Sequence, residues 1–105
     1  MADISPKMEE VQNYFVSTIN QEIKTIEKNR NLETETIIEE ALDQLEELED
    51  NYKLFIKELN SEGSARRIIN SMIKNYQQRL QVLENVLKQI DQIKNSNNIN
   101  NESYI

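Results

Sequence analysis

The stretch that decides the fold runs from Ala65 to Lys94 and reads ARRIINSMIKNYQQRLQVLENVLKQIDQIK. Most of its apolar residues recur at steps of three and four, which places them along one face of an α-helix. That face comprises Ile69, Met72, Ile73, Tyr76, Leu80, Leu83, Leu87, Ile90 and Ile93. The stretch therefore predicts one long amphipathic helix, and Ser64 before it is a favoured N-cap residue.

Three more apolar residues of this helix lie outside its main face, namely Ile68, Val82 and Val86. They widen the apolar surface beyond what one neighbouring helix can cover. Either the N-terminal helix of the chain covers them, or a second copy of the chain does. The second choice predicts a homodimer through these three residues, since two-fold dimers are the commonest closed assemblies.

Two shorter helices are predicted upstream. The first begins at Ser5-Pro6, because Pro suits the first helical position, and it ends near Lys28. Its apolar face comprises Met8, Val11, Phe15, Ile19, Ile23 and Ile26. The second helix extends from about Thr36 to Leu59, with Thr36 opening a capping box and Thr34 as the alternative cap. Its heptad-like face comprises Ile38, Leu42, Leu45, Leu48, Tyr52, Phe55 or Ile56, and Leu59.

The fold class that follows is all-α. The 105 residues include one Gly and one Pro, which leaves room for few turns. Both helix connections are short, so consecutive helices should lie antiparallel. We expect an antiparallel three-helix bundle, built as a coiled-coil-like hairpin plus an N-terminal helix. Residues 1–94 form the single domain, with helices at about 6–28, 36–59 and 65–94, and the Asn-rich residues 95–105 form a disordered tail.

Charge is divided unevenly along the chain. The formal net charge is −7, which argues against a nucleic-acid partner, because phosphate binding requires a basic surface. Ten acidic and two basic residues lie between Glu33 and Leu59, whereas six basic and two acidic residues lie between Ala65 and Lys94. This division predicts a hairpin whose two helices carry complementary charges. Such exposed pairs contribute only about 0–1 kcal/mol each, so they fix register more than stability.

Residue chemistry gives no support for catalysis. The chain has no His and no Cys, so the commonest general base and the readiest nucleophile are both absent. The acidic run that starts at Glu39 could suggest a metal site, but di-iron bundles use His and calcium loops need an internal Gly. We interpret the run as a solvated helix face. The sequence therefore predicts no enzyme, no catalytic residue, no cofactor and no metal.

Two blocks of sequence carry a family resemblance. The first is ISPKMEEVQNYF at residues 4–15, and the second combines RRII at 66–69, MIKNYQQRL at 72–80 and LENVL at 83–87. Together they resemble the C-terminal region of anti-sigma-factor-like inner-membrane proteins of Gram-negative bacteria. In that family a cytoplasmic region and one transmembrane helix precede a periplasmic helical domain. The resemblance implies no catalytic or metal residues, and the present chain lacks the membrane span and the sigma-binding region.

The resemblance implies a non-catalytic sensing or protein-interaction domain on the periplasmic side of the inner membrane, within a longer protein and with a protein partner. The alternative is a stand-alone cytoplasmic coiled-coil adaptor or assembly protein, if Met1 is the native start. A membrane span before Ile4 would direct the turn at residues 60–64 toward the bilayer. A partner site is then expected at the opposite end of the bundle, at Ile26, Ile37, Ile90 and Ile93.

Overall fold

The computed structural model describes residues 6–60 and 64–102, with side chains from Met8 to Ser96. The chain forms three helices, α1 (Pro6–Lys28), α2 (Glu35–Leu59) and α3 (Ala65–Glu102). Within the described ranges there is no strand. The predicted all-α fold and its three helices are confirmed, and the molecule measures 65 × 23 × 18 Å.

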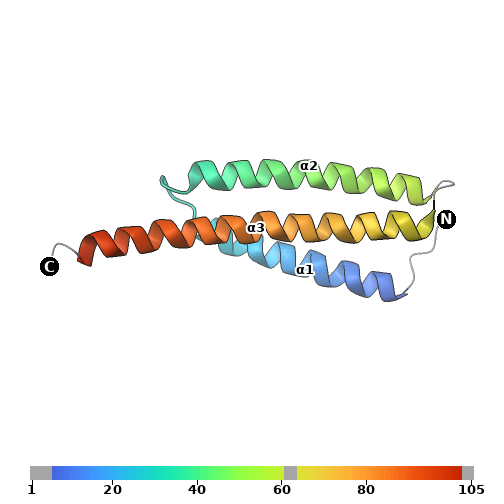
Figure 1. The fold of residues 1–105 in the computed structure, drawn as a ribbon, viewed down its shortest axis with the longest axis horizontal. Helices are drawn as coiled ribbons and strands as arrows, with labels where there is room; N and C mark the ends of the chain where they lie inside the picture. Colours follow the sequence, from blue (N-terminus) through green and yellow to red (C-terminus); the bar gives the residue numbers. More distant parts are fainter. Residues whose placement is uncertain (1–5, 61–63, 103–105) are drawn as a thin grey trace.

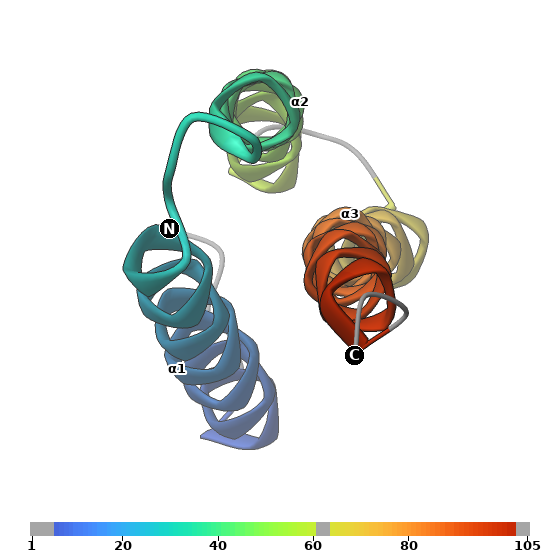
Figure 2. The ribbon, with the colours of Figure 1, turned by 90° about the vertical axis from the view of Figure 1, so that its left-hand side faces the viewer.

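The helices run up, down and up, as their short connections predict. α1 begins at the end of the molecule where α2 gives way to α3, so α1 and α3 run in the same direction (Figure 1). α3 packs against both other helices, most extensively against α2. α1 and α2 make few contacts with each other, and Figure 2 shows α1 turning away from the hairpin toward its N-terminal end.

The core is a single apolar cluster along α3. The α3 residues in it follow a heptad spacing that differs from the predicted face: Ile68 and Val86 are fully buried, whereas Ile69, Ile73, Leu80 and Leu87 are partly buried beside them. Burying such a side chain contributes roughly 1.5–3 kcal/mol, so this cluster carries most of the stability. Its buried members are Met8, Ile19, Ile26, Ile38, Ala41, Leu45, Tyr52, Leu59, Ile68, Met72, Tyr76, Leu83, Val86 and Ile90.

This register buries two of the three residues of the predicted homodimer surface. Ile68 and Val86 are 2% and 5% exposed within one chain, and Val82 is partly buried. Val82 and Val86 line a hollow with Ile37 and Ala41, so α2 covers them. Ile68 and Val86 therefore belong to the core of a single chain, and self-association through Ile68, Val82 and Val86 stays a prediction.

Ion pairs do not join the helices in the way that the charge division predicts. Between described side chains, the ion pairs are those of Arg30 with Glu27, Glu35 and Glu39, and of Lys53 with Asp50. None of these joins α2 to α3. Arg30 instead links the end of α1 to the first turns of α2 at 2.8–3.0 Å. The pKa of Arg30 is raised, chiefly by its hydrogen bond with Glu27.

Thr34 closes the connection between α1 and α2. It occupies the N-cap position of α2, but its hydroxyl makes no capping bond. The hydroxyl instead donates to the carbonyl of Asn29 at 2.8 Å and accepts from the backbone N–H of Asn31 at 2.9 Å. α2 begins at Glu35, so the predicted capping box at Thr36 is wrong. The buried Thr34 hydroxyl thus links the end of the connection to its start at Asn29.

α3 is longer than its sequence pattern predicts. It ends at Glu102 rather than near Lys94, and residues 103–105 of the predicted tail lie outside the described residues. Residues beyond Lys94 extend past α1 and α2 (Figure 1). Adding residues to an existing helix requires no new nucleation, which explains how the helix continues where apolar periodicity has ended.

Glu22 faces α3 without a partner. Its Oε2 atom is buried and forms no hydrogen bond in the described part of the chain. Burial, and then repulsion from Glu84, raise the pKa of Glu22 above its usual value of 4.5. The folded chain therefore binds this proton more tightly than the unfolded chain does, and the contribution of Glu22 to stability falls as the pH rises through its folded pKa.

We predict that Glu22→Gln raises the free energy of unfolding at pH 7 by less than about 1 kcal/mol, since Glu22 is half-buried and only part of a buried polar group's cost applies. The gain should shrink at pH 4, where the unfolded carboxyl is also largely protonated. Urea unfolding at both pH values measures this. The matched control is Glu10→Gln, an exposed residue of α1, which should show no gain.

Replacing Thr34 tests the connection. Thr34→Val keeps the shape but removes both hydroxyl hydrogen bonds, and we expect a loss of about 1–2 kcal/mol in unfolding free energy. Thr36 is exposed in the same turn, so Thr36→Val is the control and should cost less than about 0.5 kcal/mol. Equal losses in the two variants would contradict the role given to Thr34.

Candidate partner-binding groove

A polar and aromatic cluster joins all three helices near the middle of the molecule. It comprises Gln12 and Phe15 from α1, Tyr52 from α2, and Asn75, Tyr76 and Arg79 from α3; we call it the tyrosine–arginine cluster. Phe15 stacks on Tyr76, with ring centroids 5.1 Å apart and an interplanar angle of 4°. Tyr52 packs on the same ring at 4.9 Å. Stacking of this kind adds about 0.5–1.5 kcal/mol per pair to the burial of the rings.

Arg79 is the charged member of this cluster and is only 7% exposed. Its guanidinium carbon lies 5.0 Å from the ring centroid of Tyr52 and 4.8 Å from that of Tyr76. Its Nε donates to Asn75 Oδ1 at 2.8 Å, and Asn75 Nδ2 donates to the carbonyl of Leu48 at 2.8 Å. No ion pair of the described residues includes Arg79. The aromatic faces therefore supply the electrostatic attraction that a carboxylate usually supplies.

Hydrogen bonds between hydroxyl and amide groups connect the cluster to α1. Tyr76 donates its O–H to the Tyr52 oxygen at 2.9 Å, and Gln12 Nε2 donates to the same oxygen at 2.6 Å. Burial, followed by this hydrogen bond to Tyr52, raises the pKa of Tyr76. The phenol therefore stays protonated and keeps its role as a donor. Tyr52 is the shared acceptor that ties α1 to the α2–α3 hairpin.

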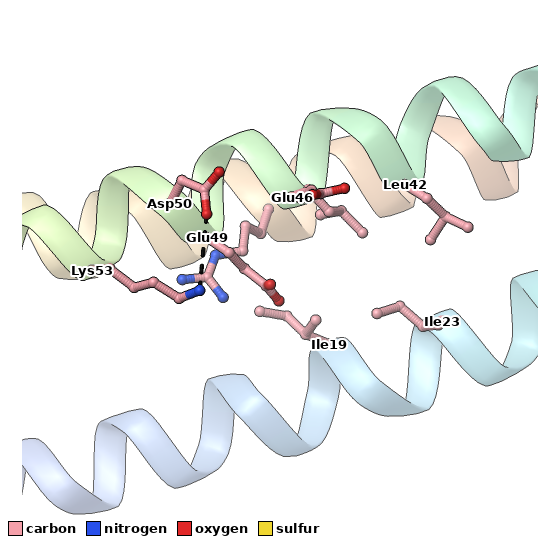
Figure 3. A pocket seen from close by; sticks show the side chains of 9 residues that line it. Ile19, Ile23, Leu42, Glu46, Glu49, Asp50 and Lys53 are labelled. Carbon is pink, nitrogen blue, oxygen red and sulfur yellow. Dashed lines mark ion pairs between the residues drawn. The ribbon is translucent and has the colours of Figure 1, made fainter.

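Beside the cluster, an open groove separates α1 from α2. Its cavity volume is about 410 Å³. Figure 3 shows Ile19 and Ile23 of α1 facing Leu42, Glu46 and Glu49 of α2 across it. The full lining comprises Ile19, Ile23, Leu42, Leu45, Glu46, Glu49, Asp50, Lys53 and Arg79.

α1 is tied to α2 on either side of the groove along the chain. Arg30 binds Glu35 and Glu39 near the connection between the helices. Toward the other end, Gln12 binds Tyr52. Between these ties Ile23 and Leu42 remain only half-buried, so apolar walls meet water. A partner side chain that entered the groove would bury them.

The predicted partner site lies elsewhere. Ile26 and Ile90 are 1% and 3% exposed, while Ile37 and Ile93 are half-buried. Lys94 hydrogen bonds to Asn29 in the same region and joins α3 to the end of α1. Two of the four residues thus belong to the core, and the other two are only partly accessible. Partner binding at Ile26, Ile37, Ile90 and Ile93 stays an untested prediction.

Sequence reasoning overlooked Arg79, Asn75 and the groove. A signal for Arg79 was present, because Met72, Tyr76, Leu83, Val86 and Ile90 are core residues whose spacing places position 79 on the same face. A single charged residue in such a series predicts a buried cation that needs partners. The groove had no comparable signal, since Ile19, Ile23 and Leu42 match a closed bundle equally well.

Comparisons with known proteins give no family assignment: no protein-family model, curated protein or solved structure matches the chain. Among the described residues, no group of three or more His, Cys, Asp or Glu side chains is placed to hold a metal ion. None of the helices, as far as they are described, has an apolar stretch long enough to cross a membrane.

The hydrogen bonds of the tyrosine hydroxyls predict how much unfolding free energy each Tyr→Phe variant loses. Tyr52→Phe removes the acceptor that Tyr76 and Gln12 share, leaving a buried donor unpaired, and should cost about 1–3 kcal/mol of unfolding free energy. Tyr76→Phe leaves the bond from Gln12 intact and should cost about 0.5–1 kcal/mol. Tyr14 is 64% exposed, so Tyr14→Phe is the control and should be neutral. Thermal unfolding followed by circular dichroism measures all three, and a greater loss in Tyr76→Phe than in Tyr52→Phe would contradict the network.

Proposed function

We propose that this chain is a non-catalytic protein-interaction domain that receives a segment of another protein in the groove between α1 and α2. The groove itself carries the proposal. One apolar residue of each wall, Ile23 of α1 and Leu42 of α2, is only half-buried, although α3 offers a continuous core beneath them. Recognition of a helical segment by an apolar groove is a recurrent mode of protein binding, in which anchors at helical spacing fill the groove.

The architecture supports a scaffold role for α3. The buried apolar residues of α3 pack against α2 on one side and against α1 on the other. One helix therefore positions both walls of the groove. The tyrosine–arginine cluster fixes this arrangement near the middle of α3. A partner would therefore meet a largely preformed surface and lose little binding free energy to reorganisation.

The family resemblance extends the proposal to a sensing domain of a membrane-bound anti-sigma-factor-like regulator. α1 begins at the same end as the α2–α3 connection (Figure 1). With a membrane span before Ile4, this end would face the bilayer and the remaining length of the domain would project away from it. The native reading frame decides between this regulator and the stand-alone adaptor. An apolar span of about 20 residues upstream of Ile4 supports the regulator, and a native start at Met1 supports the adaptor.

Site-specific photo-crosslinking in the cells that produce the protein tests the groove. A photoreactive residue in place of Ile23, on the α1 wall, should yield a crosslinked adduct with another protein. The same residue in place of Gln77, an exposed position of α3 outside the groove lining, is the control and should yield less than about a tenth of that adduct. Absence of an adduct at Ile23, or equal yields at both positions, would exclude the groove as a binding site.

A further inference from the structure

We propose that the occupant of the groove is an amphipathic helix with an apolar stripe and basic flanks, supplied by a different protein. This inference rests on the proposed function and specifies the chemistry of the partner. It follows from three features of the groove: the spacing of its apolar walls, the charge of its rim, and the way in which its two cations are held.

The apolar walls have helical spacing. Ile19 and Ile23 are separated by one turn on α1, and Leu42 and Leu45 by one turn on α2. Ile19 and Leu45 are buried, whereas Ile23 and Leu42 are half-buried and face the groove. The two walls can therefore accept the apolar stripe of another helix at Ile23 and Leu42, as in the packing of helical bundles. The groove then acts as the vacant side of a four-helix arrangement. Such an occupant presents residues at i, i+3 or i+4, and i+7 to the two walls.

The rim of the groove is acidic. Glu46, Glu49 and Asp50 line it and are exposed. Neither Glu46 nor Glu49 forms a hydrogen bond or ion pair in the described part of the chain, whereas Asp50 lies 3.9 Å from Lys53. Both partners of that pair are mostly exposed, at 75% and 68% for Lys53 and Asp50, so water weakens it. Glu46 and Glu49 are therefore available to cationic side chains.

The cations of the groove neutralise only the Asp50 part of this rim and leave Glu46 and Glu49 unpaired among the described residues. Lys53 is engaged with Asp50. Arg79 lies at the base over the rings of Tyr52 and Tyr76 and donates Nε to Asn75. It does not pair with Glu49, although both residues line the groove. Its remaining amino groups form no other hydrogen bond with the described residues. An acceptor on the partner helix, such as a Gln side chain, can meet them there.

Charge also argues against a second copy of this chain as the occupant. Each copy carries a formal net charge of −7, and two acidic surfaces repel each other. The basic helix of the chain is α3, and its apolar seam is already buried by α1 and α2. A basic amphipathic helix of a separate protein matches the groove in both respects: its apolar stripe fits the walls, and its cationic flanks fit the acidic rim.

Fluorescence anisotropy with two synthetic probes tests the inference. The probes are labelled helical peptides with the same Leu stripe, one with Lys flanks and the other with Glu flanks. The Lys peptide should bind at least about tenfold more tightly than the Glu peptide, and added salt should weaken it. Glu46→Gln/Glu49→Gln should weaken the Lys peptide about fivefold, the effect of two exposed charge pairs.

The matched control variant is Glu40→Gln/Glu47→Gln, which removes the same charge from exposed positions of α2 that do not line the groove. It should bind the Lys peptide within about twofold of the unaltered chain. Equal binding of the two peptides, or equal losses in the two double variants, overturns the basic helix. If the Ile23 adduct then still contains another protein, the proposed function stands with a different partner chemistry. An adduct formed only with a second copy of the chain overturns the inference and identifies the groove as a dimer surface.

Discussion

The guanidinium of Arg79 lies over two tyrosine rings, and only 7% of the residue is exposed. A buried cation is costly unless its surroundings replace water. The chain meets this requirement with elements of the α2–α3 hairpin: Tyr52 and a carbonyl from α2, and Asn75 and Tyr76 from α3. Arg suits this position better than Lys, because its planar group stacks on rings and is less strongly hydrated. The pairing of α2 with α3 is thereby fixed in register without an ion pair between them.

The same cluster explains why the three helices pack unevenly. Within the cluster, Phe15 of α1 stacks on Tyr76 of α3, and Gln12 of α1 donates to Tyr52 of α2. Over its whole length α1 packs mainly on α3. α2 is held by the full length of the hairpin. Since both helices pack on α3 and only slightly on each other, an apolar groove remains between them. The groove is a geometric result of two helices sharing one scaffold.

Apolar periodicity was sufficient to predict the helices and their directions, because long stripes with few Gly and Pro allow little else. It was insufficient for the register of α3, where Ile68 and Ile69, or Val86 and Leu87, are adjacent apolar residues that compete for the seam. Tertiary packing selected Ile68 and Val86. The opposite net charges of α2 and α3 were equally insufficient to predict ion pairs between them. Arg79 of α3 is buried in the core, and Arg30, in the connection between α1 and α2, pairs with three carboxylates close to it in the sequence. The groove depends on the angle between α1 and α2, which no single helix pattern encodes.

The slight packing of α1 on α2 has a consequence for native-state fluctuations. Proteins open in cooperative units whose free energies follow their buried contacts. α1 has the smaller interface with α3, so it is the unit that detaches at the lowest free energy, while the α2–α3 hairpin stays formed. Backbone amides of α1 should consequently exchange with solvent through partial opening, and those near Met72 and Leu83 only through global unfolding. The molecule is thus a stable hairpin with a more weakly attached third helix, and a ligand bound against both walls of the groove would unite these two units into one.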